Sequence, residues 1–230
     1  MGKVIFFRLF YLFVSFPLLV FSHIFEFFNI LQVRSLFVEC ESLLHDSGDF
    51  IEDELYVLLT GAEDHRNTYH YGVDYVAVFR AIFANMRGVR QGASTIEQQF
   101  VRTVTKKYGI SLKRKFVEQM LAHLVCLRFS KMKIASAYMN VAYLGFGFLG
   151  YKSVVLNDDP VLDEDFYLSV VSFLKYPKPQ NPDADWMEKV LVRRYYIDKR
   201  CKSLNISKLS SSRCYPHPTP DTASPDLKSG

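Results

Sequence analysis

One stretch of the chain, residues 61–103, gathers side chains that can do chemistry. The acids Glu63 and Asp64 open it, and His70 follows. Hydroxyl and amide side chains come next: Ser94, Thr95, Gln98 and Gln99. A packed interior avoids so many polar groups, because each buried donor or acceptor left unpaired costs about 1–3 kcal/mol. Loops on a rigid scaffold often carry binding and catalytic residues, so we predict that the candidate site lies in this stretch.

A carboxylate at the edge of a cavity can act as a general base. The apolar run at residues 55–59 leads straight to Glu63, so we expect a buried element to bring this acid to such an edge. An acidic pair such as Glu63 and Asp64 is also typical of a solvated turn or helix start. The nearby histidines and Asp74 lack HExxH-type spacing and so do not predict a metal site.

Helical patterns surround these polar residues. Apolar residues recur at near-helical spacing over residues 73–86, and glycines end the pattern. Ser94 or Thr95 can then cap the next helix, with Gln98 placed for a capping box. The elements that position the candidate site are therefore predicted to be helices.

A further amphipathic helix is predicted over residues 111–128, with Arg114 and Glu118 four residues apart at the margin of its apolar face. Such a pair is often a surface ion pair worth only about 0.3–0.5 kcal/mol. Other helical patterns cover residues 131–144, 164–174 and 190–199. Strand signals are few, so we predict a mostly α fold.

The N-terminal segment has the composition of a membrane helix. Residues 9–25 carry no Asp, Glu, Lys or Arg, and as a helix they would span about 25 Å. Lys3 and Arg8 precede this run, so the positive-inside rule places the N-terminus in the cytoplasm and exports the body of the protein. A cleaved signal peptide is the alternative. The run ends without a small-residue cleavage site, which favours an uncleaved anchor.

Composition limits the number of domains and the class of partner. The 230 residues are 49% hydrophobic and 23% charged, which suits a single sizeable core. The net charge of +4 suits anionic lipid or phosphate, but no nucleic-acid-binding motif accompanies it, so we predict no nucleic-acid partner. The sequence predicts an anchor at 1–32, an acidic connector at 33–54, a catalytic-sized domain at 55–203 and a disordered tail at 204–230.

Two motifs within the polar stretch follow the pattern of one enzyme family. The first, E-D-x-x-F-x-x-H-x-G, is matched at Glu63, Asp64, His70 and Gly72, with Asn67 where the aromatic residue is expected. The second, G-x-S-T-I-T-Q-Q-x-x-K-N, is matched at Gly92, Ser94, Thr95, Ile96, Gln98 and Gln99, with Glu97 for Thr and Arg102 for Lys.

Three more motifs follow in the family's order. R-K-x-x-E with a later Ala is matched at Arg114, Lys115, Glu118 and Ala122, with Cys126 where an acid is usual. Y-L-N-x-x-Y-x-G is matched at Tyr138, Asn140, Tyr143 and Gly145, with Ser136 where a Glu is expected. An acid-led helix that runs to a proline-rich end is seen at Glu164 and residues 177–182. Over residues 55–196 the chain thus resembles the family 51 glycosyltransferases, which include the polymerase module of class A penicillin-binding proteins and the monofunctional biosynthetic transglycosylases.

The resemblance implies a lysozyme-like, two-lobed helical domain with an N-terminal transmembrane helix, docked on the membrane through an apolar surface. It implies a peptidoglycan glycosyltransferase that polymerises lipid II, the undecaprenyl-diphosphate-linked disaccharide-peptide, with inversion and release of undecaprenyl diphosphate. The implied partners are lipid II, the growing glycan strand, the membrane and cell-wall synthesis proteins. The implied location is the inner or plasma membrane, with a single span and an extracytoplasmic catalytic domain.

The resemblance also implies a role for each matched residue. Glu63 is the expected general base, and Glu118 is the expected second acid, which supports the leaving diphosphate or its metal. A divalent cation, Mg²⁺ or Mn²⁺, is the expected cofactor. The expected substrate-binding residues are Asp64, His70, Ser94, Thr95, Gln98, Gln99, Arg102, Arg114, Lys115 and Asn140.

Two other functions remain open from the sequence. The departures at Asn67, Glu97, Cys126 and Ser136 motivate a non-catalytic homologue that binds lipid-linked precursor or a cell-wall partner. A lysozyme-like hydrolase is the second alternative, and the retained basic diphosphate positions argue against it. The stretch after residue 196 is too short for a transpeptidase domain, so we expect no cross-linking activity from this sequence.

Overall fold

The computed structural model describes residues 2–47, 51–89, 91–109, 111–158 and 161–204, and within them the mostly α prediction is confirmed. In chain order the elements are α1 Gly2–Phe27, the short 3-10 helix η1 Ile30–Gln32, α2 Val33–Asp46, α3 Asp53–Glu63, α4 Tyr75–Met86, α5 Ile96–Thr105, α6 Leu112–Arg128, α7 Lys131–Val141, β1 Tyr143–Gly145, β2 Phe148–Leu149, α8 Tyr151–Asp158, α9 Glu164–Phe173 and α10 Ala184–Leu204. The two strands form an antiparallel hairpin. The predicted disordered tail lies outside the described residues from 205 onward.

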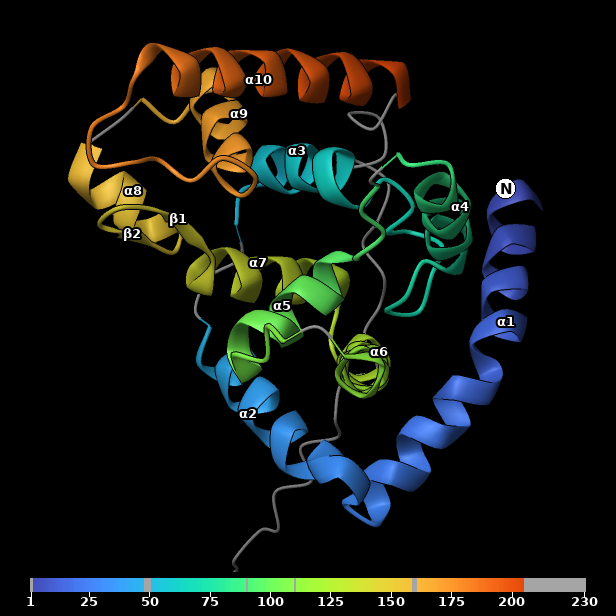
Figure 1. Cartoon of the computed structure of the whole chain (residues 1–230). Coiled ribbons are helices and arrows are strands. Elements are labelled where there is room, and N and C mark those ends of the chain that lie inside the picture. The colour runs from blue at the N-terminus through green and yellow to red at the C-terminus, as the bar shows by residue number, and fades with distance from the viewer. Residues whose placement is uncertain (1, 48–50, 90, 110, 159–160, 205–230) are drawn as a thin grey trace, which may run out of the picture.

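The helices pack in two groups, which agrees with the two-lobed, lysozyme-like expectation. In one group α3, α9 and α10 pack against one another, and in the other α2, α5, α6 and α7 do so (Figure 1). Helix α3 also contacts α7, and this contact joins the groups. Glu63 is the last residue of α3, so the fold brings the predicted base to the junction of the two groups.

The core consists of apolar side chains that recur at helical spacing. The largest fully buried ones within α2 to α7 include Phe37, Leu44, Leu55, Leu59, Phe100, Met120, Leu124, Ile134 and Met139. Helix α2 covers most of the stretch that we expected to be an acidic connector. It adds to the core because Val33, Leu36, Phe37, Cys40 and Leu44 share one buried face, while Glu39 lies on the exposed side.

Helix α1 has the length and apolar composition of a membrane span. One side of it is buried against the rest of the chain, with Tyr11 and Leu19 on that side, whereas Phe13 and Phe16 are exposed. The side chain of Glu26 at its end binds the guanidinium of Arg128 at the end of α6. The anchor therefore packs along the domain, and its orientation across a membrane remains a prediction.

Gly72 allows the loop before α4 to lie directly on α6. Its φ is +94°, and a Cβ at this position would lie only 2.3 Å from the carbonyl oxygen of Ala122. The carbonyl of Gly72 accepts a hydrogen bond from Thr95 Oγ1 at 2.6 Å, at the start of α5. Because both the backbone angle and the close approach require a missing side chain, Gly72 locks three elements together.

Replacing Gly72 should cost more stability than replacing a glycine that needs only its backbone angle. We expect Gly72→Ala to lower the free energy of unfolding by about 2–4 kcal/mol, since a left-handed backbone costs about 1–2 kcal/mol and the clash with Ala122 adds a similar amount. Gly88→Ala is the matched control: its φ is +78°, and an added Cβ would meet no atom within 4 Å. Chemical denaturation measures both, and equal losses would contradict the role of the close contact.

Candidate active site

Glu63 lies where helices from both groups meet. One of its carboxylate oxygens accepts a hydrogen bond from Arg193 Nη2 of α10 at 2.7 Å, and the other accepts one from Gln99 Nε2 of α5 at 3.0 Å. Gln99 is held in turn by the hydroxyl of Tyr138 in α7, which donates to Gln99 Oε1 at 2.7 Å. These two bonds hold both oxygens of the carboxylate in place. The Glu63 side chain is still 18% exposed, so it reaches the surface. The structure thus brings together two predicted site residues, Glu63 and Gln99.

Glu118 forms the second acidic centre, on the side of α6 that faces α5. Arg114 Nη1 donates to one carboxylate oxygen at 2.5 Å, and the ammonium of Lys115 donates to the other. Lys115 also donates to Ser94 Oγ at 3.3 Å. The Glu118 side chain is only 3% exposed, so this is not the weak surface pair that its spacing also allowed. Four predicted site residues therefore form one charged cluster.

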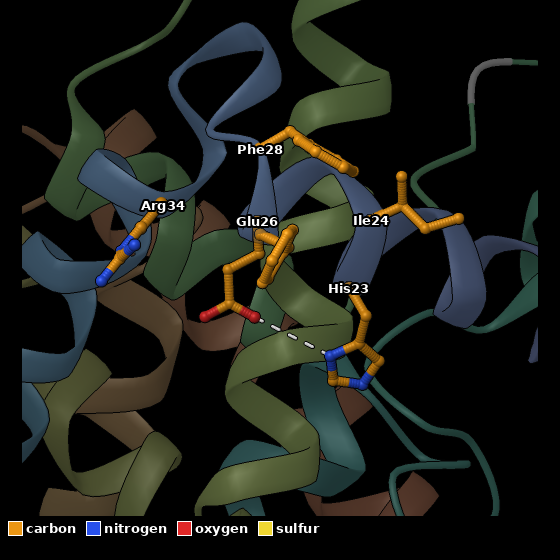
Figure 2. Close-up of a pocket in the computed structure, with 6 residues that line it drawn as sticks. His23, Ile24, Glu26, Phe28 and Arg34 are labelled. Carbon is orange, nitrogen blue, oxygen red and sulfur yellow. Dashed lines mark ion pairs between the residues drawn. The ribbon is translucent and has the colours of Figure 1, made fainter.

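A small pocket between α5 and α6 is lined by charged side chains of this cluster. Arg102, Arg114 and Glu118 line it, together with apolar residues of both helices. Arg102 thus joins the basic residues beside Glu118. A larger hollow lies at the bend between α1 and α2, where His23, Glu26 and Phe28 line it (Figure 2). No predicted site residue lines that hollow.

Asp64 is buried in a hydrogen-bond network beneath the site. Its carboxylate accepts hydrogen bonds from His70 Nε2 at 2.9 Å, from Asn67 Nδ2 at 3.1 Å and from the backbone N–H of Ile96 at 3.3 Å. Burial alone would raise the pKa of Asp64, but its neighbours His70 and Lys131 more than offset burial and hold that pKa well below its usual range. Asp64 therefore ties the end of α3 to the start of α5 as a buried anion.

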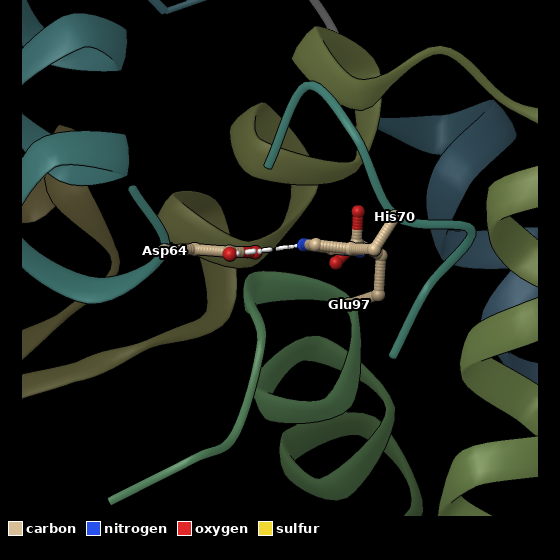
Figure 3. Close-up of side chains that lie close together, drawn as sticks. All are labelled: Asp64, His70 and Glu97. Atoms are coloured by element: carbon tan, nitrogen blue, oxygen red, sulfur yellow. Dashed lines mark hydrogen bonds and ion pairs between the residues drawn. The ribbon is translucent and has the colours of Figure 1, made fainter. Parts of the chain in front are cut away.

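Glu97 occupies the same network, and Lys131 of α7 balances its charge. The ammonium of Lys131 donates to Glu97 Oε1 and lies 3.3 Å from Nδ1 of His70. Figure 3 shows Asp64, His70 and Glu97 converging from three segments. Asn67 Nδ2 also approaches Glu97 Oε1, at 3.5 Å. Two of the residues that depart from the family pattern, Asn67 and Glu97, are thus partners in one buried network.

The other predicted residues have different surroundings. Thr95 and Gln98 form the predicted capping box at the start of α5, and both are buried. Ser136, a third departure from the family pattern, accepts a hydrogen bond from the backbone N–H of Ile51 at 3.0 Å and so has a structural partner. Asn140 is half-buried near the end of α7.

At Glu97 and Glu118, cationic side chains already bind the carboxylates that would hold Mg²⁺ or Mn²⁺. Among those residues, Asp64, His70 and Glu97 could bring three ligand atoms within 4.8 Å of one another. The ammonium of Lys131 already binds Glu97 there, and a metal ion would have to displace it. Both oxygens of Glu118 are also bound by cationic side chains. The expected divalent cation therefore remains a prediction about the reaction.

Arg193 is the member of the site that sequence patterns do not predict. It lies 130 residues from Glu63 along the chain, and no local spacing links the two positions. The basic pair Arg193 and Arg194 in the last helix is the signal that could have drawn attention to it. Which of the two arginines reaches Glu63 depends on how α10 packs on α3.

Comparison with known proteins gives one family. Residues 45–156 match a family model described as Transglycosylase. Penicillin-binding protein 1A of Neisseria cinerea is 35% identical over 159 residues, which cover 65% of this chain and 19% of that protein. Penicillin-binding protein 1A of Aquifex aeolicus is 36% identical over 162 residues, which cover 67% of this chain and 22% of that protein. The chain thus spans about a fifth of the length of these curated relatives.

Removing the Lys131 ammonium should destabilise the fold, because Glu97 would be left as a buried, uncompensated carboxylate. We expect Lys131→Met to lower the free energy of unfolding by about 3–5 kcal/mol. The double variant Glu97→Gln with Lys131→Met should recover much of the loss, since it removes both charges. Lys189→Met, which breaks an exposed pair with Asp185 in α10, is the control and should show no measurable change. Equal behaviour of the two lysine variants in chemical denaturation would refute the network's role.

Stability should also fall in mild acid because of His123. This buried α6 side chain binds the Tyr71 carbonyl through Nδ1 and the Tyr75 hydroxyl through Nε2. Burial lowers the pKa of His123 to about 4, whereas the unfolded value is about 6.5. Between these values the unfolded chain binds a proton that the folded chain does not, so the free energy of unfolding drops by up to about 3 kcal/mol as pH falls from about 6.5 to 4.

The His123→Gln variant removes this titration and should flatten that part of the stability curve. Denaturant midpoints measured at several pH values test it. An identical pH dependence in the wild-type chain and the variant would show that other groups cause the acid loss.

Proposed function

This chain belongs to the transglycosylase family, and from that premise we propose that it is a membrane-bound peptidoglycan glycosyltransferase that polymerises lipid II. The observation that carries the proposal is the placement of Glu63. A carboxylate held on both oxygens at the junction of two helical groups has the rigid orientation that a general base needs. The basic cluster around Glu118 supplies charge for the diphosphate of a lipid-linked donor.

Glu63 would accept the proton of the attacking sugar hydroxyl. The 4-hydroxyl oxygen of the acceptor unit forms a bond to the anomeric carbon of the lipid-linked chain, and its proton passes to Glu63. The bond from that carbon to the diphosphate breaks, and its electron pair leaves with the diphosphate. Because the hydroxyl attacks the face opposite the diphosphate, the configuration of the anomeric carbon inverts. A carboxylate has about four lone-pair positions, and Arg193 and Gln99 use two of them, which leaves acceptor capacity for the hydroxyl.

Arg102, Arg114 and Lys115 would stabilise the departing diphosphate. Guanidinium and ammonium groups form charge-assisted hydrogen bonds with phosphate oxygens, and Arg can do so with two parallel bonds. In this structure Glu118 binds Arg114 and Lys115 through its two oxygens. We infer that Glu118 keeps these cations oriented and compensated until the diphosphate arrives. This role explains why the buried Glu118 lies beside basic side chains, and it does not require a metal ion at Glu118.

The membrane would deliver the substrate to this site. Helix α1 has the properties of a span, and Tyr11 in its first half donates a hydrogen bond to Asp74, the residue that caps α4, at 2.6 Å. On α4 the apolar side chains Phe79, Phe83 and Met86 are exposed. We propose that the apolar face of α4 lies in the leaflet next to the exported domain, where an undecaprenyl chain would also lie, and that α1 spans the membrane with its N-terminus in the cytoplasm.

The decisive experiment removes the base while keeping its size. Purified full-length protein would be incubated with lipid II and Mg²⁺, Mn²⁺ or a chelator, and polymer would be measured on gels. We expect Glu63→Gln to lower the rate about 10²- to 10⁴-fold, as is typical for loss of a general base, with binding of lipid II kept within about tenfold. Glu54→Gln, an exposed change on the same helix, should leave the rate within about twofold.

Other outcomes would favour other functions. A wild-type chain that binds lipid II yet makes no polymer under any of these conditions would indicate the binding-only homologue. Cleavage of polymerised glycan without a lipid-linked donor would indicate the hydrolase. Normal polymerisation by Glu63→Gln would remove Glu63 from the mechanism.

A further inference from the structure

Arg193 makes two contacts at the end of α3 and one with a residue of its own helix, α10. Its Nη2 donates to Glu63 Oε1 at 2.7 Å and lies 3.4 Å from the carbonyl oxygen of Ala62. Its guanidinium carbon lies 5.5 Å from the ring centroid of Tyr196, one turn further along α10. The Arg193 side chain is only 11% exposed. This arginine is therefore packed into the site.

The end of α3 has a physical need for such a cation. The last carbonyls of a helix carry the negative end of its dipole, which disfavours a carboxylate at the same place. Glu63 is the last residue of α3 and faces this unfavourable field. The Arg193 guanidinium lies close to both the carboxylate and the Ala62 carbonyl, so it compensates both negative groups. Gln99 on the other oxygen is neutral and supplies orientation without charge.

Among the described residues, Arg193 is the cation that binds Glu63 directly. From α7, the Tyr138 hydroxyl faces this region. Burial and the charge of Glu63 raise the pKa of Tyr138, and the charge of Arg102 in α5 lowers it. Arg102 lines the separate pocket beside Glu118. On α10, the neighbouring Arg194 points elsewhere and binds the exposed Asp165 of α9 at 2.6 Å.

We infer that Arg193 is a positioning residue for the proposed reaction: it holds Glu63 against Gln99 so that the unused lone pairs of the carboxylate face the incoming sugar hydroxyl. This inference rests on the proposed function and extends it to a residue of α10, outside the part of the chain that matches the family model. Arg193 itself need not touch the substrate. Its loss should therefore slow the chemical step and leave substrate binding nearly unchanged.

Steady-state kinetics with lipid II separate these effects. We expect Arg193→Met to lower kcat about 10- to 100-fold, because a misplaced catalytic group commonly costs that much, while KM stays within about threefold. Arg193→Lys keeps one charged donor and should recover at least about threefold of the loss. Arg194→Met is the matched control on the same helix, and its kcat should stay within about twofold of the wild type. A large rise in KM with unchanged kcat would overturn the positioning role.

A double-variant cycle tests whether Arg193 acts through Glu63. In a Glu63→Gln background the base is already absent, so adding Arg193→Met should lower the residual rate by less than about twofold. A further loss as large as that in the wild-type background would show that Arg193 acts separately, for example on the diphosphate, and would overturn the inference. Melting curves of every variant show whether a rate loss comes from unfolding.

A chemical measurement decides the contact without any polymerisation. Glu63 would be labelled with a water-soluble carbodiimide and an amine, and the labelled peptide quantified by mass spectrometry. Labelling should be several-fold faster in Arg193→Met than in the wild type, and unchanged in Arg194→Met. Equal labelling in all three would overturn the pairing. If the wild-type chain makes no polymer, the proposed function fails by itself, together with the catalytic role of Arg193, while the labelling rates still decide the contact.

Discussion

The site depends on the requirement that a buried carboxylate must have a partner for its charge. Asp64, Glu97 and Glu118 are each almost fully buried, and each is bound by a basic or donor side chain. An unpaired buried ion costs several kcal/mol, so α5 and α7 must pack where Lys131 can reach Glu97. Glu118 is instead compensated within its own helix, by Arg114 and Lys115. Charge compensation therefore restricts how α5 packs against α7, in addition to apolar packing.

Glu63 satisfies the same requirement differently. Its partners Arg193 and Gln99 come from opposite helical groups, and the side chain remains partly exposed. The carboxylate is thus oriented without being closed off, whereas Asp64 is oriented and closed off. The two adjacent acids of one motif therefore differ in their surroundings. Glu63 faces the candidate site, and Asp64 fixes the backbone that carries Glu63. The helix end at Glu63 creates the difference, because the chain turns inward at the next residue.

Three of the departures from the family pattern, Asn67, Glu97 and Ser136, have structural partners. Asn67 and Glu97 replace residues of other chemistry, yet they meet in one network with Lys131. Ser136 binds the backbone of Ile51. Taken one at a time in the sequence, these substitutions indicate a degenerate site. In the fold Asn67, Glu97 and Ser136 each have a bonding partner, and Glu63 and Glu118 are each bound by basic side chains.

The sequence by itself determined the features that local interactions encode. Helical spacing predicted most of the helices, the capping box at Thr95 and Gln98 was readable from three residues, and the apolar run predicted α1. Motif order indicated the family and Glu63. Only the tertiary structure decided that α2 adds to the core and that Arg193, rather than Arg194, binds Glu63. Local patterns specify hydrogen bonds within one helix, whereas a contact across 130 residues depends on how whole helices pack.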